Sequence, residues 1–245
     1  LWHARNAQDT LEQLFRDCED DAECQAMYPK LRDQWKRVIE RPDLDGPSRE
    51  ALRTLLLTTK SQQKLPSLIA SLSEGDFRTF REQFASANSG ALAEGLYLSV
   101  VCAEDAPYIR ADQRASAVAG TFLGAYRLEE QTRACEEWNI PVVALTYAQR
   151  PQDVPLLIVA GDRDYVTPLA WSRRIMSAFP RSRLVVVPKL GHFPDGLENL
   201  QCLDAITNAF FERGDPASLD VSCVSSMKPG PFVGSAKGKT PADAQ

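Results

Sequence analysis

The sequence has no long apolar run and no excess of basic residues. Its longest purely aliphatic stretch, residues 156–160, is far shorter than the roughly 18 apolar residues needed to cross a bilayer, so no membrane span is expected. The 28 Lys and Arg residues are outnumbered by 33 Asp and Glu residues, which gives a formal net charge of −5. Since a nucleic-acid-binding protein normally carries a basic face, nucleic acid is not an expected partner.

Histidine is scarce, and the cysteines are not spaced for a metal site. The 245 residues include two histidines, His3 and His192, and no two cysteines form a Cys-x-x-Cys pair. Structural zinc sites need four Cys or His ligands at characteristic spacings, so neither a metal nor an organic cofactor is expected. His3 is expected at the surface, which leaves His192 as the histidine of interest.

The six cysteines allow many pairings, and the sequence alone does not choose among them. Their clustering suggests three links: Cys18 with Cys24, Cys102 with Cys135, and Cys202 with Cys223. Because disulfides persist in oxidising compartments, this interpretation predicts a secreted or cell-envelope protein. The alternative is six buried free thiols in a cytosolic protein, where Cys packs as a small hydrophobic residue.

Residues 1–130 are expected to form a mainly helical cap or lid. Apolar residues recur there at helical spacing between Pro, Gly and Ser, as in the stripe Leu31, Trp35, Val38 and Ile39. Such stripes are most simply core-facing, although a groove for an apolar substrate is an alternative. Other helices are expected to begin near Thr10, which is spaced like a capping box with Gln13, and after Pro47, Leu65 and Asp76. The last of these would bury Phe77, Phe80 and Phe84.

Residues 131–224 are expected to form the C-terminal part of an α/β core. Residues 154–160 and 183–188 are short apolar runs, typical of strands buried on both faces of a parallel sheet. Between them, Thr167 is placed to cap a helix that has Pro168 at its first position. A closing helix should end near Gly214, and the Pro/Gly/Lys-rich residues 225–245 should form an extended or loosely ordered tail. In such a fold, sites lie beyond the carboxyl ends of the strands.

Two candidate catalytic residues follow the two predicted strands. Asp164 follows the first strand and His192 the second, so the two loops are adjacent if the strands are adjacent. A buried carboxylate that accepts the Nδ1 proton of a histidine fixes its tautomer and leaves the other nitrogen as a general base. The alternatives are that Asp164 caps the following helix, that Asp162 is the acid, and that His192 is a core residue.

These motifs resemble those of one known family. Gly161-x-x-Asp164-x-x-x-Pro168 and Gly191-His192 recur across α/β-hydrolases. The cysteine positions and the segment Cys102-Ala-Glu-Asp105 are more specific, and they resemble secreted α/β-hydrolases of the tripeptidyl aminopeptidase and proline iminopeptidase group. The resemblance covers most of the chain.

The resemblance implies an exported serine aminopeptidase that cleaves peptides from a free N-terminus through an acyl-enzyme. His192 would shuttle the proton and Asp164 would orient His192. Glu104 and Asp105 would hold the substrate ammonium group by charge-assisted hydrogen bonds, although an ordinary surface ion pair explains these two residues equally well. The implied substrate is a peptide or a small ester or amide.

One family feature is missing. The sequence contains no Gly-x-Ser-x-Gly nucleophile elbow: Ser89 and Ser235 lie near glycines but not at the required spacing. The expected fold is therefore a partial α/β-hydrolase with a helical cap, its nucleophile-bearing N-terminal half absent. That half, from a longer precursor, a split gene or a truncated record, is the expected partner. The alternative functions are a carboxylesterase with the same triad and a non-catalytic interaction chain.

Overall fold

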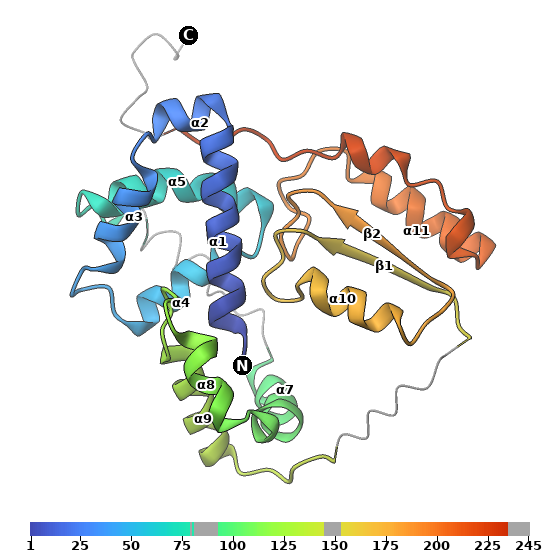
Figure 1. The fold of residues 1–245 in the computed structure, drawn as a ribbon, viewed down its shortest axis with the longest axis horizontal. Coiled ribbons are helices and arrows are strands. Elements are labelled where there is room, and N and C mark those ends of the chain that lie inside the picture. The colour runs from blue at the N-terminus through green and yellow to red at the C-terminus, as the bar shows by residue number, and fades with distance from the viewer. Residues whose placement is uncertain (79, 81–92, 145–152, 235–245) are drawn as a thin grey trace.

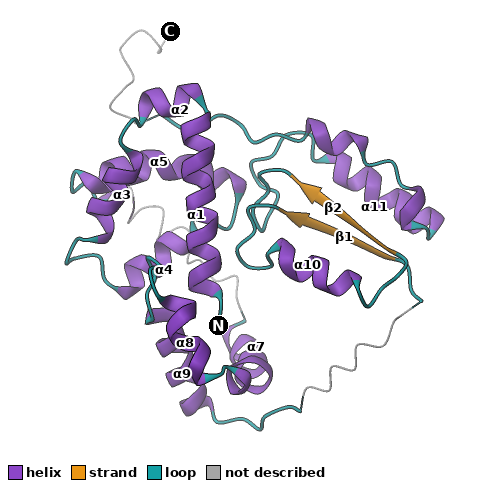
Figure 2. Cartoon of the chain, viewed as in Figure 1, coloured by secondary structure: helices purple, strands orange, loops and turns teal. Residues whose placement is uncertain are grey.

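The computed structural model describes residues 1–78, 80, 93–144 and 153–234, which form a helical part and an α/β part (Figure 1). Within these ranges, every regular element up to Trp138 is helical (Figure 2). The helices of this part are α1 (His3–Asp20), α2 (Ala22–Met27), α3 (Leu31–Ile39), α4 (Gly46–Thr54), α5 (Thr59–Ser73), α7 (Glu94–Val100), α8 (Ala111–Val118) and α9 (Tyr126–Trp138), with a π-helical turn η1 (Val101–Asp105) and a 3₁₀ turn η2 (Ala106–Tyr108) after α7. Helix α9 spans the boundary predicted at residue 130 and contacts α4, α7 and the two turns.

The helical part has a core of its own. Trp35 of α3 is buried, as its position in the predicted stripe requires, and packs edge-on against Phe15 of α1 and Phe122, with ring centroids 6.1 and 5.4 Å away. Phe122 comes from the segment between α8 and α9, so helices far apart in the sequence share one apolar cluster. Burial of such large side chains contributes most of the stability of a helical part of this size.

Two predicted helix starts were wrong. Helix α1 begins at His3, and Thr10 lies buried inside it, so there is no capping box at that position. Helix α5 begins at Thr59 rather than after Leu65, because Thr58 caps it by accepting a hydrogen bond from the Ser61 amide. Of the predicted Phe77, Phe80 and Phe84 stripe, Phe80 is buried in the core and Phe84 lies outside the described residues.

The α/β part contains two parallel strands in the described ranges. Strand β1 (Leu156–Gly161) pairs with β2 (Ser182–Val187) in the register Leu156↔Ser182 to Gly161↔Val187. Helix α10 (Leu169–Met176) packs against both strands, and α11 (Gln201–Arg213) packs on β2 (Figure 1). Gly214, with φ +63°, ends α11 as predicted. The strands were predicted to be buried on both faces, and for β1 this was wrong: Val159 is 39% exposed because the described chain leaves that side uncovered.

The C-terminal segment of the α/β part returns to the helical part. After 3₁₀ turns η3 (Pro216–Ser218) and η4 (Ser222–Ser226), residues 227–234 form neither a helix nor a regular strand. The side-chain amide of Gln63, in α5, donates to the Gly230 carbonyl at 2.6 Å, and the Gln63 backbone carbonyl accepts from the Val233 amide at 3.0 Å. The first half of the predicted tail is therefore bound to the helices, and residues 235–245 lie outside the described ranges.

Three disulfide bonds link the pairs that the clustering suggested. Cys18–Cys24 joins α1 to α2, Cys102–Cys135 joins η1 to α9, and Cys202–Cys223 joins α11 to η4. No helix in the described part of the chain is long and apolar enough to cross a membrane.

Candidate active site

The structure brings Asp164 and His192 together. Asp164 lies in the loop after β1 and His192 in the loop after β2, and parallel neighbouring strands end at the same edge of a sheet. The His192 Nδ1 atom is 2.9 Å from Oδ2 of Asp164. The adjacency expected from the sequence is thus present, while the catalytic roles of the two residues stay a prediction.

The Asp164 carboxylate is buried and fully hydrogen-bonded. Its Oδ1 accepts from the amides of Val166 and Thr167 at 2.8 and 3.0 Å, and its Oδ2 accepts from the Thr167 hydroxyl at 2.6 Å as well as facing His192. Burial alone raises the pKa of this carboxyl, but the hydrogen bonds from Thr167 and His192 outweigh it and bring the pKa below its ordinary value. An ionised carboxylate only accepts, so Nδ1 of His192 is the donor in this contact, and in the neutral imidazole Nε2 is then the acceptor.

Thr167 does not cap α10, which corrects the sequence interpretation. Pro168 occupies the N-cap position and no side chain caps that helix. The hydroxyl is instead turned back to Asp164, where a charged acceptor makes the stronger hydrogen bond. The Asp-x-x-Thr spacing was the available signal, because a side chain three residues on can reach an Asp in a tight turn.

Asp162, the alternative acid, does not contact His192 in the structure. Its Oδ1 accepts from the Lys189 amide at 2.6 Å and lies 3.2 Å from the Arg163 guanidinium. Burial raises the pKa of Asp162, an effect that the charge of Arg163 partly opposes. Asp162 therefore ties the two loops together, while Asp164 faces the imidazole.

His192 is held from its backbone and stays accessible at its ring. Its amide donates to the Leu57 carbonyl at 2.7 Å, and 29% of its side chain is exposed. A Cβ on the preceding Gly191 would lie 2.7 Å from the same carbonyl oxygen, and a Cβ on Gly161 would overlap the Leu190 carbonyl. The two glycines of the motifs therefore permit the close approach of the strand ends to each other and to the helical part.

Asp105 lines a cavity of about 630 Å³, and Glu104 does not. The cavity lies between the start of α1, η1, α9 and α10, and Arg127 and Trp171 also line it. His3, which was expected at the surface, is half-buried in its wall because α1 begins there. The role of Glu104 and Asp105 in holding an ammonium group stays a prediction.

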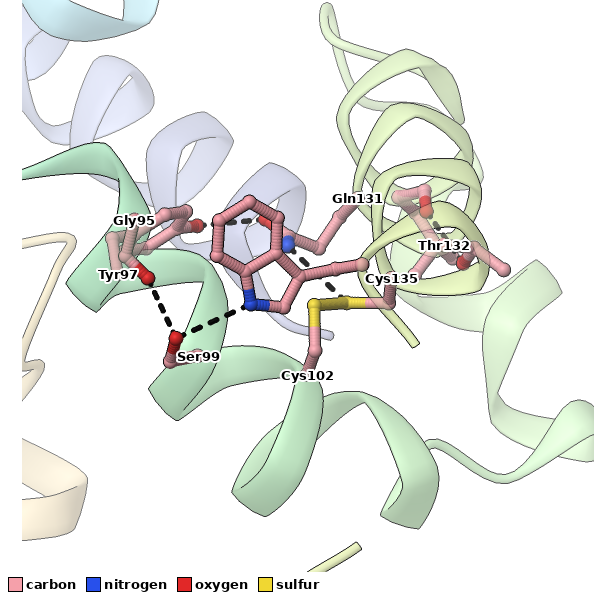
Figure 3. The surroundings of a disulfide bond; sticks show 9 residues. Gly95, Tyr97, Ser99, Cys102, Gln131, Thr132 and Cys135 are labelled. Carbon is pink, nitrogen blue, oxygen red and sulfur yellow. Dashed lines mark hydrogen bonds between the residues drawn. A yellow bond between two sulfur atoms is a disulfide. The ribbon is translucent and has the colours of Figure 1, made fainter. Parts of the chain in front are cut away.

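A disulfide fixes the turn that carries Asp105. Cys102 of η1 is bonded to Cys135 of α9, and the Gln131 side chain lies between this bond and Tyr97 (Figure 3). The Tyr97 hydroxyl donates to Gln131 Oε1 at 2.8 Å, and Gln131 Nε2 donates to the Cys135 sulfur at 3.6 Å. The turn before Asp105 is therefore anchored covalently and through a side-chain network.

The two serines near glycines and possible metal ligands complete the list of candidate site residues. Ser89 and Ser235 lie outside the described residues. Within the described ranges, no group of three or more His, Cys, Asp and Glu side chains could hold a metal ion.

Comparison with known proteins yields one match. Residues 120–223 match the family model described as TAP-like protein, while the curated proteins and the solved structures give no match. The matched segment contains both strands of the sheet and both members of the Asp164–His192 pair. The match supports an α/β-hydrolase of the TAP-like group, and with it a hydrolase.

Proposed function

We propose that this chain supplies the acid and the base of a serine hydrolase of the α/β-hydrolase type. The observation that carries the proposal is the contact between Asp164 and His192 at the carboxyl ends of two parallel strands. A buried carboxylate on Nδ1 keeps the imidazole in one tautomer and stabilises the imidazolium that forms during turnover. The partial exposure of the His192 side chain supports access of a nucleophile to Nε2.

The nucleophilic serine comes from a polypeptide outside this sequence, in the N-terminal half of the hydrolase. Within the described ranges β1 has β2 as its strand partner, so its other edge is open. Trp171 and Ile175 of α10, which packs on both strands, are 44% and 48% exposed. An open strand edge beside exposed apolar side chains supports further strands that would complete the sheet.

The reaction would proceed through an acyl-enzyme. The serine hydroxyl attacks the substrate carbonyl while Nε2 of His192 takes its proton, and the resulting imidazolium then gives that proton to the leaving amine. Water, deprotonated by His192, hydrolyses the ester and returns the serine. Asp164 remains ionised throughout, in keeping with its lowered pKa.

The favoured substrate is a peptide with a free N-terminus. Its ammonium group would be held by Asp105, which lines the cavity of about 630 Å³. Val166, two residues after Asp164, lines the same cavity, which supports a short path from the ammonium site to the scissile bond. The three disulfides support export to the cell envelope or beyond.

A fluorophosphonate probe, which reacts with activated serines, tests the proposal on this chain joined with its upstream half. We expect labelling of the complete protein and a large loss of labelling in Asp164→Asn. Asp162→Asn is the matched control, because Asp162 is a neighbouring carboxylate that does not touch His192; it should keep its labelling. A complete protein that resists the probe would leave a non-catalytic interaction chain as the function.

A second assay separates peptidase from esterase. Faster turnover of aminoacyl amides than of p-nitrophenyl esters, lost when the substrate amine is acetylated, would support the aminopeptidase. Ester turnover that is indifferent to a free amine would favour a carboxylesterase with the same Asp164 and His192.

A further inference from the structure

The two residues beside Asp164 both reach into the helical part. Arg163 makes a two-pronged ion pair with Asp17 of α1, at 2.9 and 3.0 Å, and donates to Gln13 at 2.8 Å. Tyr165 is fully buried in the core of the helical part. The acid of the candidate pair therefore lies between two side chains that are anchored outside the α/β part.

Tyr165 is held by a buried arginine. Nη1 of Arg53, at the end of α4, donates to the Tyr165 hydroxyl at 2.8 Å, and its guanidinium carbon lies 5.2 Å from the centre of the ring. Glu50 accepts from Nε of the same arginine at 2.8 Å and from Arg127 of α9 at 2.6 Å. The Tyr165 contact is thus one end of a charged network that spans two helices.

The loop that carries His192 rests on the residues that follow Arg53. The Leu57 carbonyl accepts from the amides of His192 and Phe193, at 2.7 and 3.1 Å. The Thr59 hydroxyl lies 3.2 Å from the Gly191 amide and donates to the Lys189 carbonyl at 3.2 Å. One short segment, from the end of α4 to the start of α5, therefore contacts both loops.

We propose that this segment, Arg53–Thr59, is a positioning element that sets the distance between Asp164 and His192, with the Arg53–Tyr165 hydrogen bond as its critical contact. The inference rests on the proposed function and deepens it. If the helical part swung open as a unit, α4 and α5 would move with it. Tyr165 and the His192 backbone, which are hydrogen-bonded to the segment between these helices, would then be pulled out of place. The helical part is then a fixed half of the catalytic apparatus, and substrate must enter without its displacement.

The test uses Tyr165→Phe, which keeps the buried ring and removes the acceptor of the Arg53 hydrogen bond. Tyr28→Phe is the matched control: Tyr28 is also buried in the helical core and its hydroxyl donates to the Val233 carbonyl at 2.6 Å, with no bond to the candidate site. Both variants lose one hydroxyl group from the same core. Melting followed by near-ultraviolet circular dichroism checks that both remain folded.

The readout is the Nδ1 proton of His192 in the chain labelled with ¹⁵N-histidine. With two histidines in the sequence, His3→Gln assigns the signals directly. A proton held by the Asp164 carboxylate should resonate far downfield and exchange slowly with water. We expect this resonance in the unmodified chain and in Tyr28→Phe, and its loss or at least a tenfold faster exchange in Tyr165→Phe.

Three outcomes would overturn the inference. The first is the absence of the downfield resonance in the unmodified chain, and the second is an unchanged resonance in Tyr165→Phe. The third is an equal loss of the resonance in both variants, which would indicate a general loosening of the core. The signal does not depend on turnover. Failure of the probe labelling above with an intact Tyr165 effect would therefore refute the proposed function and leave the positioning role standing.

Discussion

Replacing Asp164 by Asn should cost about 3 kcal/mol of unfolding free energy at pH 7. The residue is 8% exposed, and Oδ2 faces both the Thr167 hydroxyl and the His192 imidazole. An amide nitrogen at that position presents hydrogens to two donors. Hydrogen bonds to a charged group contribute about 1.5–3 kcal/mol each, and rotation of the Thr167 hydroxyl recovers part of the loss.

Thr167→Val separates the two partners of Oδ2. It removes the hydroxyl donor in a side chain of the same shape and leaves the carboxylate with His192 and two amides. The expected cost is about 1–2 kcal/mol, since a buried charged acceptor loses one of several donors. The double variant that combines Asp164→Asn with Thr167→Val should cost less than the sum of the single changes, because both remove the same hydrogen bond.

Urea unfolding of the disulfide-intact chain from pH 7 to pH 3 measures these values and their pH dependence. The pKa of Asp164 in the folded state lies below its ordinary 3.8, so the carboxylate stabilises the fold above that value and the contribution disappears as the pH falls through the folded pKa. The gap between the unmodified chain and Asp164→Asn should narrow below about pH 4. A gap under about 1 kcal/mol at pH 7, or one unchanged at pH 3, would refute the role assigned to the carboxylate.

Three other predictions concern stability. Gly161→Ala should lower the melting temperature sharply, because its Cβ falls on a backbone carbonyl of the loop after β2, whereas Gly95→Ala, in helix α7, meets only ordinary contacts and should not. Burial, and to a smaller extent the nearby positive charges, lower the pKa of His3 to about 3. The free energy of unfolding should therefore fall as the pH drops below 6.5, because the unfolded chain takes up a proton there and the folded chain does not. His3→Gln should reduce this fall, as measured by urea titrations at pH 7 and pH 5. Replacing Cys202 and Cys223 by Ser opens a 21-residue link and should cost about 3 kcal/mol in the same titrations.

The strands and the site loops could be predicted because each is specified by a local pattern. Two short apolar runs, each followed by a loop with a glycine at or near its start, are enough to place Asp164 and His192 at one sheet edge, provided that the strands are neighbours. The start of α1 could not be predicted in the same way. The buried residues near its start, Ala4 and Ala7, are small and give only a weak apolar periodicity. The helix start was therefore predicted near Thr10, where the capping-box spacing and larger apolar residues give a clearer signal.

The role of Thr167 was missed for a different physical reason. A Thr before Pro fits a helix cap by propensity, and propensity holds where no stronger acceptor competes. In the folded chain an ionised carboxylate lies 2.6 Å away and takes the hydroxyl hydrogen bond. The tail that follows Ser225 shows that composition does not predict specific partners. Its Pro and Gly residues predict an extended chain, but they do not predict that its backbone hydrogen-bonds to Gln63.

The contacts between the Asp164 loop and the helices are made by residues at positions that the sequence motif leaves unspecified. In Gly-x-x-Asp the positions that define the motif are the glycine and the acid, yet Arg163 and Tyr165 on either side of the acid carry the contacts to α1 and α4. Their partners lie more than 100 residues earlier in the chain, and the sequence offers no periodic signal that joins such distant charges. A single sequence therefore predicts the Asp164–His192 pair, whereas the contacts that link its loop to α1 and α4 emerge only in the fold.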